Sequence, residues 1–144
     1  MRMGFVTVEW LGSSLSEDYP LHLISNQPRN KLHSQLDHGA VSQADRPNGY
    51  EPVYLHPLDA AEYGITDGDI VRVFNQRGAC LGEARLTEDL RRRVIKMSTG
   101  AWFAPDEDGV CHGGNPNVLT VDKGTSGLAQ GPVAHSCLVD VVKV

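Results

Sequence analysis

Hydrophobic and polar residues alternate along several short stretches of the chain, as is typical of half-buried β-strands. In one such stretch, even-numbered residues from Cys80 to Leu86 share one face, while Glu83 and Arg85 share the other. Proline, glycine and polar residues separate the stretches. The pattern predicts strands over residues 21–26, 52–56, 69–75, 79–87, 94–98 and 136–144.

Helical signals are sparse. Residues 57–63 begin with Pro57, carry Asp59 in their first turn and are followed by Gly64, so they predict one short helix. Residues 40–44 and 87–92 are long enough for single helical turns. Many short strands with one or two short helices predict a closed β-barrel.

Two long stretches, residues 28–50 and 104–132, lack strand patterns and are rich in Gly, Asn, Gln, Asp, Ser and His. Loops of this length in a compact domain are usually functional or disordered. Apolar residues such as Val118 and Leu128 recur within the second stretch, which favours an ordered loop over the barrel. We expect a lead-in segment over residues 1–18 and one domain over residues 19–144.

Composition narrows the class of protein. The 144 residues fit one domain, 40% of them are hydrophobic, and the formal net charge is −5. This acidic balance argues against binding to nucleic acid or to a membrane surface. No apolar run approaches the ~20 residues of a membrane span, and the first residues do not resemble a signal peptide.

Cysteine spacing predicts neither a disulfide framework nor a zinc site. The chain has three cysteines, Cys80, Cys111 and Cys137. Two of them, Cys80 and Cys137, lie in alternating apolar runs and are predicted to be buried thiols.

Common catalytic and phosphate-binding motifs are absent from the sequence: GxxxxGK[ST], GxGxxG after a strand, HExxH and GxSxG. The six histidines are scattered, and the spacing of His33 and His38 fits metal sites poorly. We therefore predict no catalytic residue and no metal ligand within the chain.

Clusters of amides, hydroxyls and glycines remain, at residues 26–35, 114–117, 122–126 and 130–132. A carboxamide presents a donor beside an acceptor and so matches the edge of a purine or pterin ring. Glycines let backbone N–H groups approach phosphate oxygens, and Arg29, Lys31 and Lys123 would neutralise a diphosphate. The same residue types are also ordinary turn formers, so both interpretations stay open.

Several segments in order along the chain resemble one family. They include YPLHLISNQPRNKLHSQ at residues 19–35, GITDGDIVRVFN at 64–75, GAWF at 100–103 and GNPNVLTVDKGTSGLAQG at 114–131. Together they are similar to the C-terminal molybdopterin dinucleotide-binding domain of the dimethyl sulfoxide reductase family. Within that family, the resemblance is to the trimethylamine N-oxide and biotin sulfoxide reductases.

The resemblance implies a mainly β fold: a six- to seven-stranded double-psi β-barrel with one or two short helices and long polar loops. It implies that the chain caps a larger oxidoreductase and binds a bis(molybdopterin guanine dinucleotide) molybdenum cofactor, shared with preceding domains. Such an enzyme reduces S- or N-oxides by oxygen-atom transfer, in the bacterial cytoplasm or the periplasm. Its metal ligand and substrate funnel lie in the preceding domains, so the isolated chain is expected to be inactive.

The resemblance also implies which residues contact the cofactor. They are Ser25, Asn26, Lys31, His33, Ser34, Gln35, Asn115, Asn117, Gln130, Gly131, Pro132 and Val133. Asp122, Thr125 and Ser126 would contact the cofactor or brace the loop, and the same alternative applies to Asn117. Lys31 stands where the family usually has arginine, which would replace a planar fork with a point charge.

Other assignments are expectations about single residues. The run from Arg91 to Arg93 is predicted to be a solvated turn. Trp102 and Phe103 are predicted to anchor the core, with a cofactor-facing platform as the alternative. Arg72 is expected to face water, and His56 to stand at a helix start.

Two further functions stay open. A pyruvoyl-dependent decarboxylase would cleave itself at a Gly-Ser bond inside the barrel, but Gly12-Ser13 precedes the first strong strand. A peptide-binding module would present an exposed apolar groove, which the amide-rich loops fit poorly.

Overall fold

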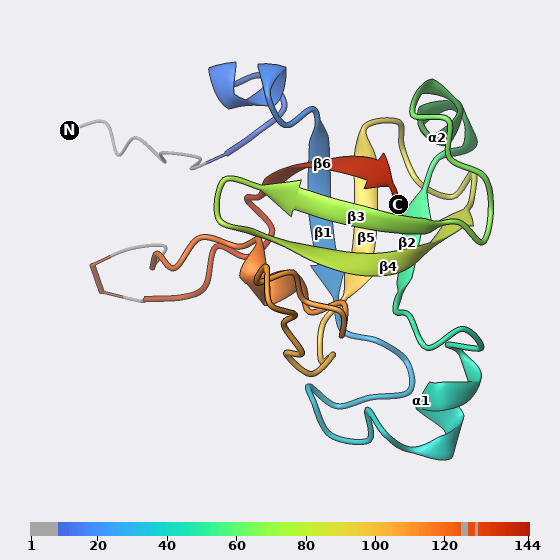
Figure 1. The fold of residues 1–144 in the computed structure, drawn as a ribbon. Helices are drawn as coiled ribbons and strands as arrows, with labels where there is room; N and C mark the ends of the chain where they lie inside the picture. Colours follow the sequence, from blue (N-terminus) through green and yellow to red (C-terminus); the bar gives the residue numbers. More distant parts are fainter. Residues whose placement is uncertain (1–8, 125–126, 129) are drawn as a thin grey trace.

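The computed structural model describes residues 9–124, 127–128 and 130–144. Within these residues, six strands close into a barrel in the order β1-β5-β2-β4-β3-β6 (Figure 1). The strands are β1 (Leu21–Asn26), β2 (Pro52–Leu55), β3 (Ile70–Asn75), β4 (Gly78–Leu86), β5 (Val94–Ser98) and β6 (Leu138–Lys143). Each predicted strand is present, with ends that shift by two residues or fewer.

The strand pairing has an internal symmetry. β1 pairs with β5 in parallel and β2 pairs with β4 in parallel, while the other four ladders are antiparallel. Exchanging β1, β2 and β3 for β4, β5 and β6 leaves this set of ladders unchanged. Two such interlocked halves, each crossing the other through a parallel pair, make a double-psi β-barrel, which confirms the predicted fold class.

Inward-facing residues of every strand form one core. Leu23, Val53, Val71 and Ile95 are fully buried, and so are all three cysteines. The cysteines are free thiols, as predicted for Cys80 and Cys137. Burial raises the pKa of both of these thiols, that of Cys137 to about 11, so both stay protonated at neutral pH.

β4 departs from the predicted alternation, because it is buried on both faces from Ala79 to Ala84. Glu83, expected on a solvated face, is 3% exposed. Asn48 donates a hydrogen bond of 2.9 Å to it, and Arg85 lies 2.7 Å away (N to O). Asn48 belongs to the loop before β2, so this loop covers Glu83, while Cys111 forms backbone hydrogen bonds with Ala79 and Leu81. Periodicity within one strand cannot predict burial by segments from elsewhere in the chain.

Short helices lie outside the barrel: α1 (Ala40–Ala44), α2 (Pro57–Glu62) and the 3-10 helices Ser14–Glu17 (η1) and Pro116–Val118 (η2). His56 caps α2, since its Nδ1 accepts a hydrogen bond from Leu58 N. Residues 87–92 form turns and no helix. No helix in the described part of the chain is long and apolar enough to cross a membrane.

The arginine run before β5 is solvent-exposed, as predicted, but it is not free of contacts. Asp59, buried in α2, accepts hydrogen bonds from Arg92 Nε at 2.9 Å and from Arg93 N at 2.6 Å. Arg72 of β3 is exposed as expected and lies over the ring of Phe74.

β2 and β4 approach so closely that residue 82 has no room for a side chain. A Cβ at Gly82 would lie 2.2 Å from Val53 Cγ2 and 2.8 Å from the backbone oxygen of Glu51. We expect Gly82→Ala to lower the free energy of unfolding by about 1–3 kcal/mol, because the clash includes backbone. Urea denaturation measures this, with Gly127→Ala as the control, since no atom of the described residues lies within 4 Å of a Cβ there. Equal stability of both variants would contradict this packing.

Candidate functional site

Segments far apart in the sequence meet at one end of the barrel. β1 and β5 run in parallel and end together, with Asn26 opposite Ser98, so the chain leaves both strands at the same edge. A hollow of about 660 Å³ lies there, which we call the amide hollow. Its lining comes from both ends of the loop after β1, from residues 99–103, from the Asn115 turn and from the approach to β6. From the loop and the turn these are Ser25, Gln27, His33, Ser34, Asn115 and Asn117, and from the approach to β6 they are Ala134 and His135.

Two glycines allow these segments to touch. Gly100 has φ of +97°, and a Cβ there would lie 1.9 Å from the backbone oxygen of His33. A Cβ at Gly113 would lie 2.0 Å from the backbone oxygen of Trp102. The segment after β5 is therefore in backbone contact with the loop after β1 on one side and with the approach to η2 on the other.

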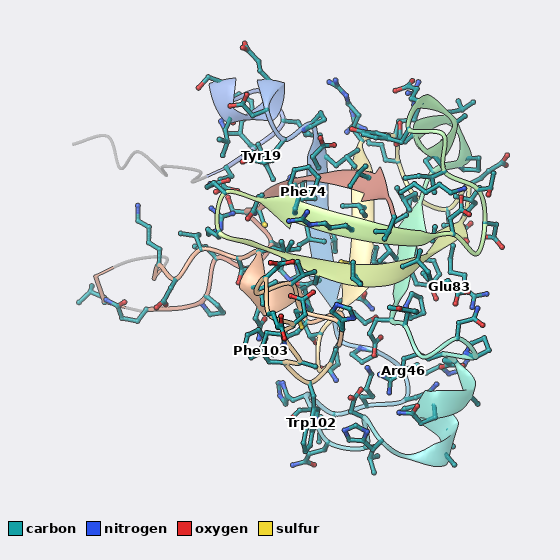
Figure 2. The ribbon with its side chains drawn as sticks, in the orientation of Figure 1. Tyr19, Arg46, Phe74, Glu83, Trp102 and Phe103 are labelled. Atoms are coloured by element: carbon teal, nitrogen blue, oxygen red, sulfur yellow. The ribbon has the colours of Figure 1, made fainter. Side chains whose placement is uncertain are left out.

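Trp102 and Phe103 were predicted to anchor the core, and that prediction is wrong. Their exposed fractions are 56% and 60%, and Figure 2 shows both rings outside the barrel. Trp102 Nε1 donates a hydrogen bond to Ser34 O, and the Trp102 ring packs edge-on against His38 at 4.8 Å between centroids. Strand side chains already fill the barrel, so the segment after β5 carries its rings to the rim of the amide hollow.

η2 fixes the turn that carries the two asparagines. Asn115 Oδ1 accepts a hydrogen bond of 2.9 Å from Asn117 N, which makes Asn115 the N-cap. Pro116 between them is buried, and Leu119 after them is fully buried in the core. The predicted apolar anchoring is confirmed at Val118 and Leu119, which pack on or in the core. It is wrong for Leu128, whose side chain is fully exposed.

A second hollow of about 490 Å³ adjoins the amide hollow and shares Asn117 and Ala134 with it. We call it the Lys123 hollow. Besides Asn117, three predicted contact residues line it, Gln130, Pro132 and Val133, together with Asp122. Thr125 and Ser126 lie outside the described residues.

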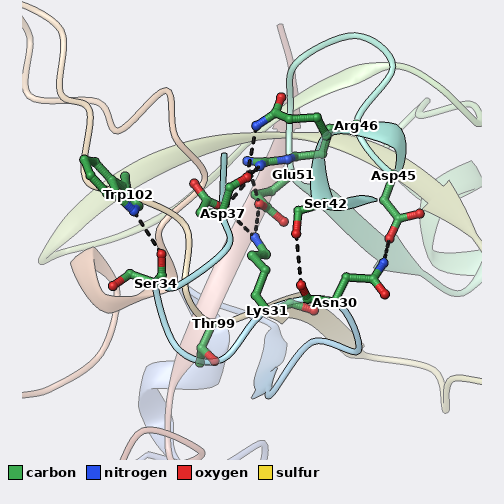
Figure 3. Close-up of polar contacts among 12 residues, drawn as sticks. Asn30, Lys31, Ser34, Asp37, Ser42, Asp45, Arg46, Glu51, Thr99 and Trp102 are labelled. Atoms are coloured by element: carbon green, nitrogen blue, oxygen red, sulfur yellow. Dashed lines mark hydrogen bonds and ion pairs between the residues drawn. The ribbon is translucent and has the colours of Figure 1, made fainter. Parts of the chain in front are cut away.

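A buried cluster of four charged residues supports the loop after β1 (Figure 3). Lys31 Nζ donates a hydrogen bond of 2.8 Å to Asp37 Oδ1 and another to Glu51 Oε1. Arg46 pairs with the same two carboxylates at 3.1 Å and 2.9 Å. All four side chains are at most 8% exposed, and their charges sum to zero.

This cluster changes the role that the sequence suggests for Lys31. Its ammonium already has two carboxylate partners, so it is bound within the protein and is not free to neutralise a diphosphate. The pKa of Asp37 is lowered: burial acts to raise it, and the hydrogen bond from Lys31 with the charges of Lys31 and Arg46 outweighs that effect.

The predicted contact residues therefore fall into groups. Five line the amide hollow: Ser25, His33, Ser34, Asn115 and Asn117. Lys31 and Asn26 line a different hollow of about 860 Å³, which also includes Arg46 and Glu51. Gln35 and Gly131 line none of these hollows. Gln27 and Thr99 line the amide hollow although they were not predicted as contacts. Trp102 lines it as well, in the position that the sequence offered as the alternative to a core anchor.

The lining of the amide hollow suits a polar, anionic, ring-containing ligand. Side-chain amides and hydroxyls come from Ser25, Gln27, Ser34, Asn115 and Asn117, and an indole stands at the rim. None of the described residues that line it is acidic, so nothing there repels a phosphate group. Within the described residues, no group of three or more His, Cys, Asp or Glu is placed to hold a metal ion.

The sequence of the barrel and of the segments around the amide hollow matches a known family. Residues 21–138 match the family model described as the molydopterin dinucleotide binding domain. The chain belongs to this family. The match covers strands β1 to β5, the first residue of β6 and each segment that lines the amide hollow. The resemblance inferred from the sequence motifs is therefore confirmed.

Individual relatives agree with the family. A biotin sulfoxide reductase of Cereibacter sphaeroides is 48% identical over 134 residues, which cover 92% of this chain and 18% of the relative. A trimethylamine-N-oxide reductase of Haemophilus influenzae is 42% identical over 140 residues, covering 94% of this chain and 17% of the relative. The chain thus spans less than a fifth of the length of these curated relatives.

The fold also has a solved counterpart. Acetylene hydratase from Pelobacter acetylenicus superposes with a TM-score of 0.75 at 18% sequence identity, over 94% of this chain and 20% of the hydratase. At this identity, the likeness shows the fold alone.

The buried cluster predicts a pH-dependent stability. Since the folded-state pKa of Asp37 lies below its unfolded value, its contribution is complete above about pH 4 and is lost as the pH falls through the folded pKa. Asp37→Asn leaves two buried cations with one carboxylate. We expect it to lower the free energy of unfolding at neutral pH by about 3 kcal/mol, and to weaken the loss of stability below about pH 4.

Urea denaturation over a series of pH values measures both effects. Asp108→Asn, at an exposed carboxylate, is the matched control and should change neither quantity. If Asp37→Asn and Asp108→Asn unfold alike at every pH, the cluster does not stabilise the loop.

Proposed function

We propose that the amide hollow and the adjoining Lys123 hollow bind one arm of a molybdopterin guanine dinucleotide, within a larger enzyme that reduces S- or N-oxides. The observation that carries this proposal is the meeting of the loop after β1, the segment after β5 and the Asn115 turn around one hollow without a lining acid. Family membership and the reductase names of the relatives support it.

The residues of the hollow suit the parts of such a ligand. Asn115 and Asn117 offer carboxamides to the edge of a fused heterocycle, and the Trp102 indole offers a flat apolar face beside them. Ser25 and Ser34 offer hydroxyls. Lys123 in the adjoining hollow supplies a cation for a diphosphate.

When bound, such a cofactor would supply the two-electron chemistry of oxygen-atom transfer at its molybdenum. The residues of this chain bind and orient it and exclude water from one side. The second arm of a bis(molybdopterin guanine dinucleotide) would be held by other parts of the enzyme. Lys31 would act through its buried partners, by holding the loop that carries His33 and Ser34.

Guanosine diphosphate tests the binding proposal in the full 144-residue chain, because it carries the guanine and the diphosphate of the proposed ligand. Titration followed by NMR should shift the amides of Ser34, Trp102, Asn115 and Asn117. The affinity is expected in the millimolar range, since the chain supplies part of a larger pocket. Shifts confined to the opposite end of the barrel, or none up to about 10 mM, would refute the proposal.

Tryptophan fluorescence gives a second measurement of the same binding. The chain has two tryptophans, so Trp10→Phe leaves Trp102 as the single reporter. Guanosine diphosphate should quench Trp102 in this variant and should leave Trp10 unchanged in Trp102→Phe.

The Asn115 amide can be tested without disturbing its turn. Asn115→Asp keeps the oxygen that caps η2 but removes the N–H donor and adds a negative charge. We expect it to weaken binding of guanosine diphosphate about tenfold, with an unchanged melting temperature. Ser14→Asp adds the same charge on η1, outside the hollow, and should bind as the parent chain does. Equal affinity of the two variants would exclude Asn115 as a contact.

The chain alone should not turn over substrate, because this proposal assigns the metal ligand and the substrate site to other parts of the enzyme. We expect no reduction of trimethylamine N-oxide by a reduced dye in the presence of the 144-residue chain. Measurable turnover would show that the chain is itself an enzyme and that its proposed role is incomplete.

A further inference from the structure

Arg77, in the turn between β3 and β4, holds the loop that carries Asn115 and Asn117 by its backbone. Its Nε donates a hydrogen bond of 2.6 Å to the carbonyl oxygen of Leu119. Leu119 is the C-cap of η2, so this carbonyl belongs to the end of the same turn. Arg77 lines none of the three hollows described above.

The Leu119 carbonyl is a fixed point in the structure. Besides Arg77, Asn75 Nδ2 donates to it at 2.8 Å and Cys137 Sγ at 3.2 Å. The Leu119 side chain is fully buried in the core. Just before it, the backbone of Val118 lies against β4, where a Cβ at Gly78 would be 2.9 Å from Val118 O. The C-terminal end of η2 is therefore held on both its backbone and its side chain.

Glu9 holds Arg77 in this orientation. The two side chains form a bidentate pair, with Nη1 to Oε1 at 2.5 Å and Nη2 to Oε2 at 3.1 Å. Glu9 is 5% exposed, and its Oε2 also accepts a hydrogen bond of 2.7 Å from Leu138 N at the start of β6.

The backbone of Glu9 is fixed as well. Glu9 N donates to Ser136 Oγ at 3.0 Å, and Ser136 Oγ donates to Glu9 O at 2.9 Å. The segment before β1 is thus bound to the start of β6 through both its backbone and a carboxylate. The same carboxylate binds the Arg77 guanidinium, which donates to Leu119 O. The segment before β1 is therefore linked through Arg77 to the end of η2.

We propose that Arg77, oriented by Glu9, is a positioning residue for the Asn115–Asn117 turn. It fixes the orientation of the two side-chain amides toward the amide hollow. Through Glu9, it also links that orientation to the position of the segment before β1. The effect on ligand binding rests on the proposed function, whereas the effect on the turn does not.

Amide hydrogen exchange in the full chain tests the effect on the turn. Arg77→Lys keeps a positive charge but cannot donate to Leu119 O and to both Glu9 oxygens together. We expect exchange at Asn117 and Leu119, whose N–H groups are hydrogen-bonded within the turn, to become about tenfold faster. Exchange at Val71 and Val73 of β3 should not change, since a positioning role is local.

Further variants test whether the change in hydrogen exchange at the turn follows the number of hydrogen bonds lost, and provide controls. Glu9→Gln keeps the shape and one acceptor but loses the charge, so we expect an intermediate acceleration. Arg77→Met removes every side-chain donor and should give a larger acceleration than Arg77→Lys. Arg72→Lys and Glu17→Gln make the same chemical changes at exposed positions and should leave exchange at the turn as it is.

Binding of guanosine diphosphate to the same variants tests whether the orientation of the turn affects ligand affinity. We expect Arg77→Lys to weaken it about fivefold at an unchanged number of sites. Unchanged exchange at Asn117 and Leu119, or equal acceleration at all amides, would overturn the positioning role. So would unchanged affinity in a variant whose turn exchanges faster. If the parent chain does not bind guanosine diphosphate but the turn responds as expected, the proposed function fails and the coupling of Arg77 to the turn stands.

Discussion

The parallel pairing of β1 with β5 is the constraint on which the site depends. Parallel strands end at the same edge, and here the register sets Asn26 opposite Ser98. The loop after β1 and the segment after β5 must therefore start side by side. Gly100 and Gly113 then allow backbone contacts that any side chain would block. The amide hollow exists because topology brings these segments together, and the loop sequences supply its chemistry.

Polar networks at two places hold loops that a hydrophobic core alone would leave loose. The neutral cluster of Lys31, Asp37, Arg46 and Glu51 lies under the loop after β1. Buried ion pairs often add little net stability, yet removing one member is costly, so such a cluster specifies one loop conformation. Hydrogen bonds to Leu119 O fix the other side of the hollow. Both networks join residues that are distant in the sequence. The geometry of the hollow therefore depends on contacts between several segments of the chain.

Much of the barrel could be predicted from the sequence, because the alternation of hydrophobic and polar residues along a strand indicates which of its side chains are buried. Positions such as Leu23, Val71 and Ile95 alternate with less buried neighbours, and all three are buried as expected. Glu83 and Trp102 were misplaced for the opposite reason. A distant loop covers the first, and the second lies on a segment that leaves a barrel already filled. The resemblance of the motifs to the family correctly predicted that Ser34 and Asn115 lie at the same hollow. The buried carboxylate partners of Lys31 could not be predicted, because they depend on tertiary contacts that no local sequence pattern encodes.

If the proposed function holds, the segments after β1 and β5 and the Asn115 turn contact the same ring system of one ligand. Transferred nuclear Overhauser effects between guanosine diphosphate and the full chain test it most directly, since they remain measurable when binding is weak. We expect contacts from the guanine H8 or ribose protons to the rings of His33 or Trp102 and to the side-chain amide of Asn115 in the same sample. Contacts to residues of one segment alone, or to η1 and α2 at the other end of the barrel, would contradict it.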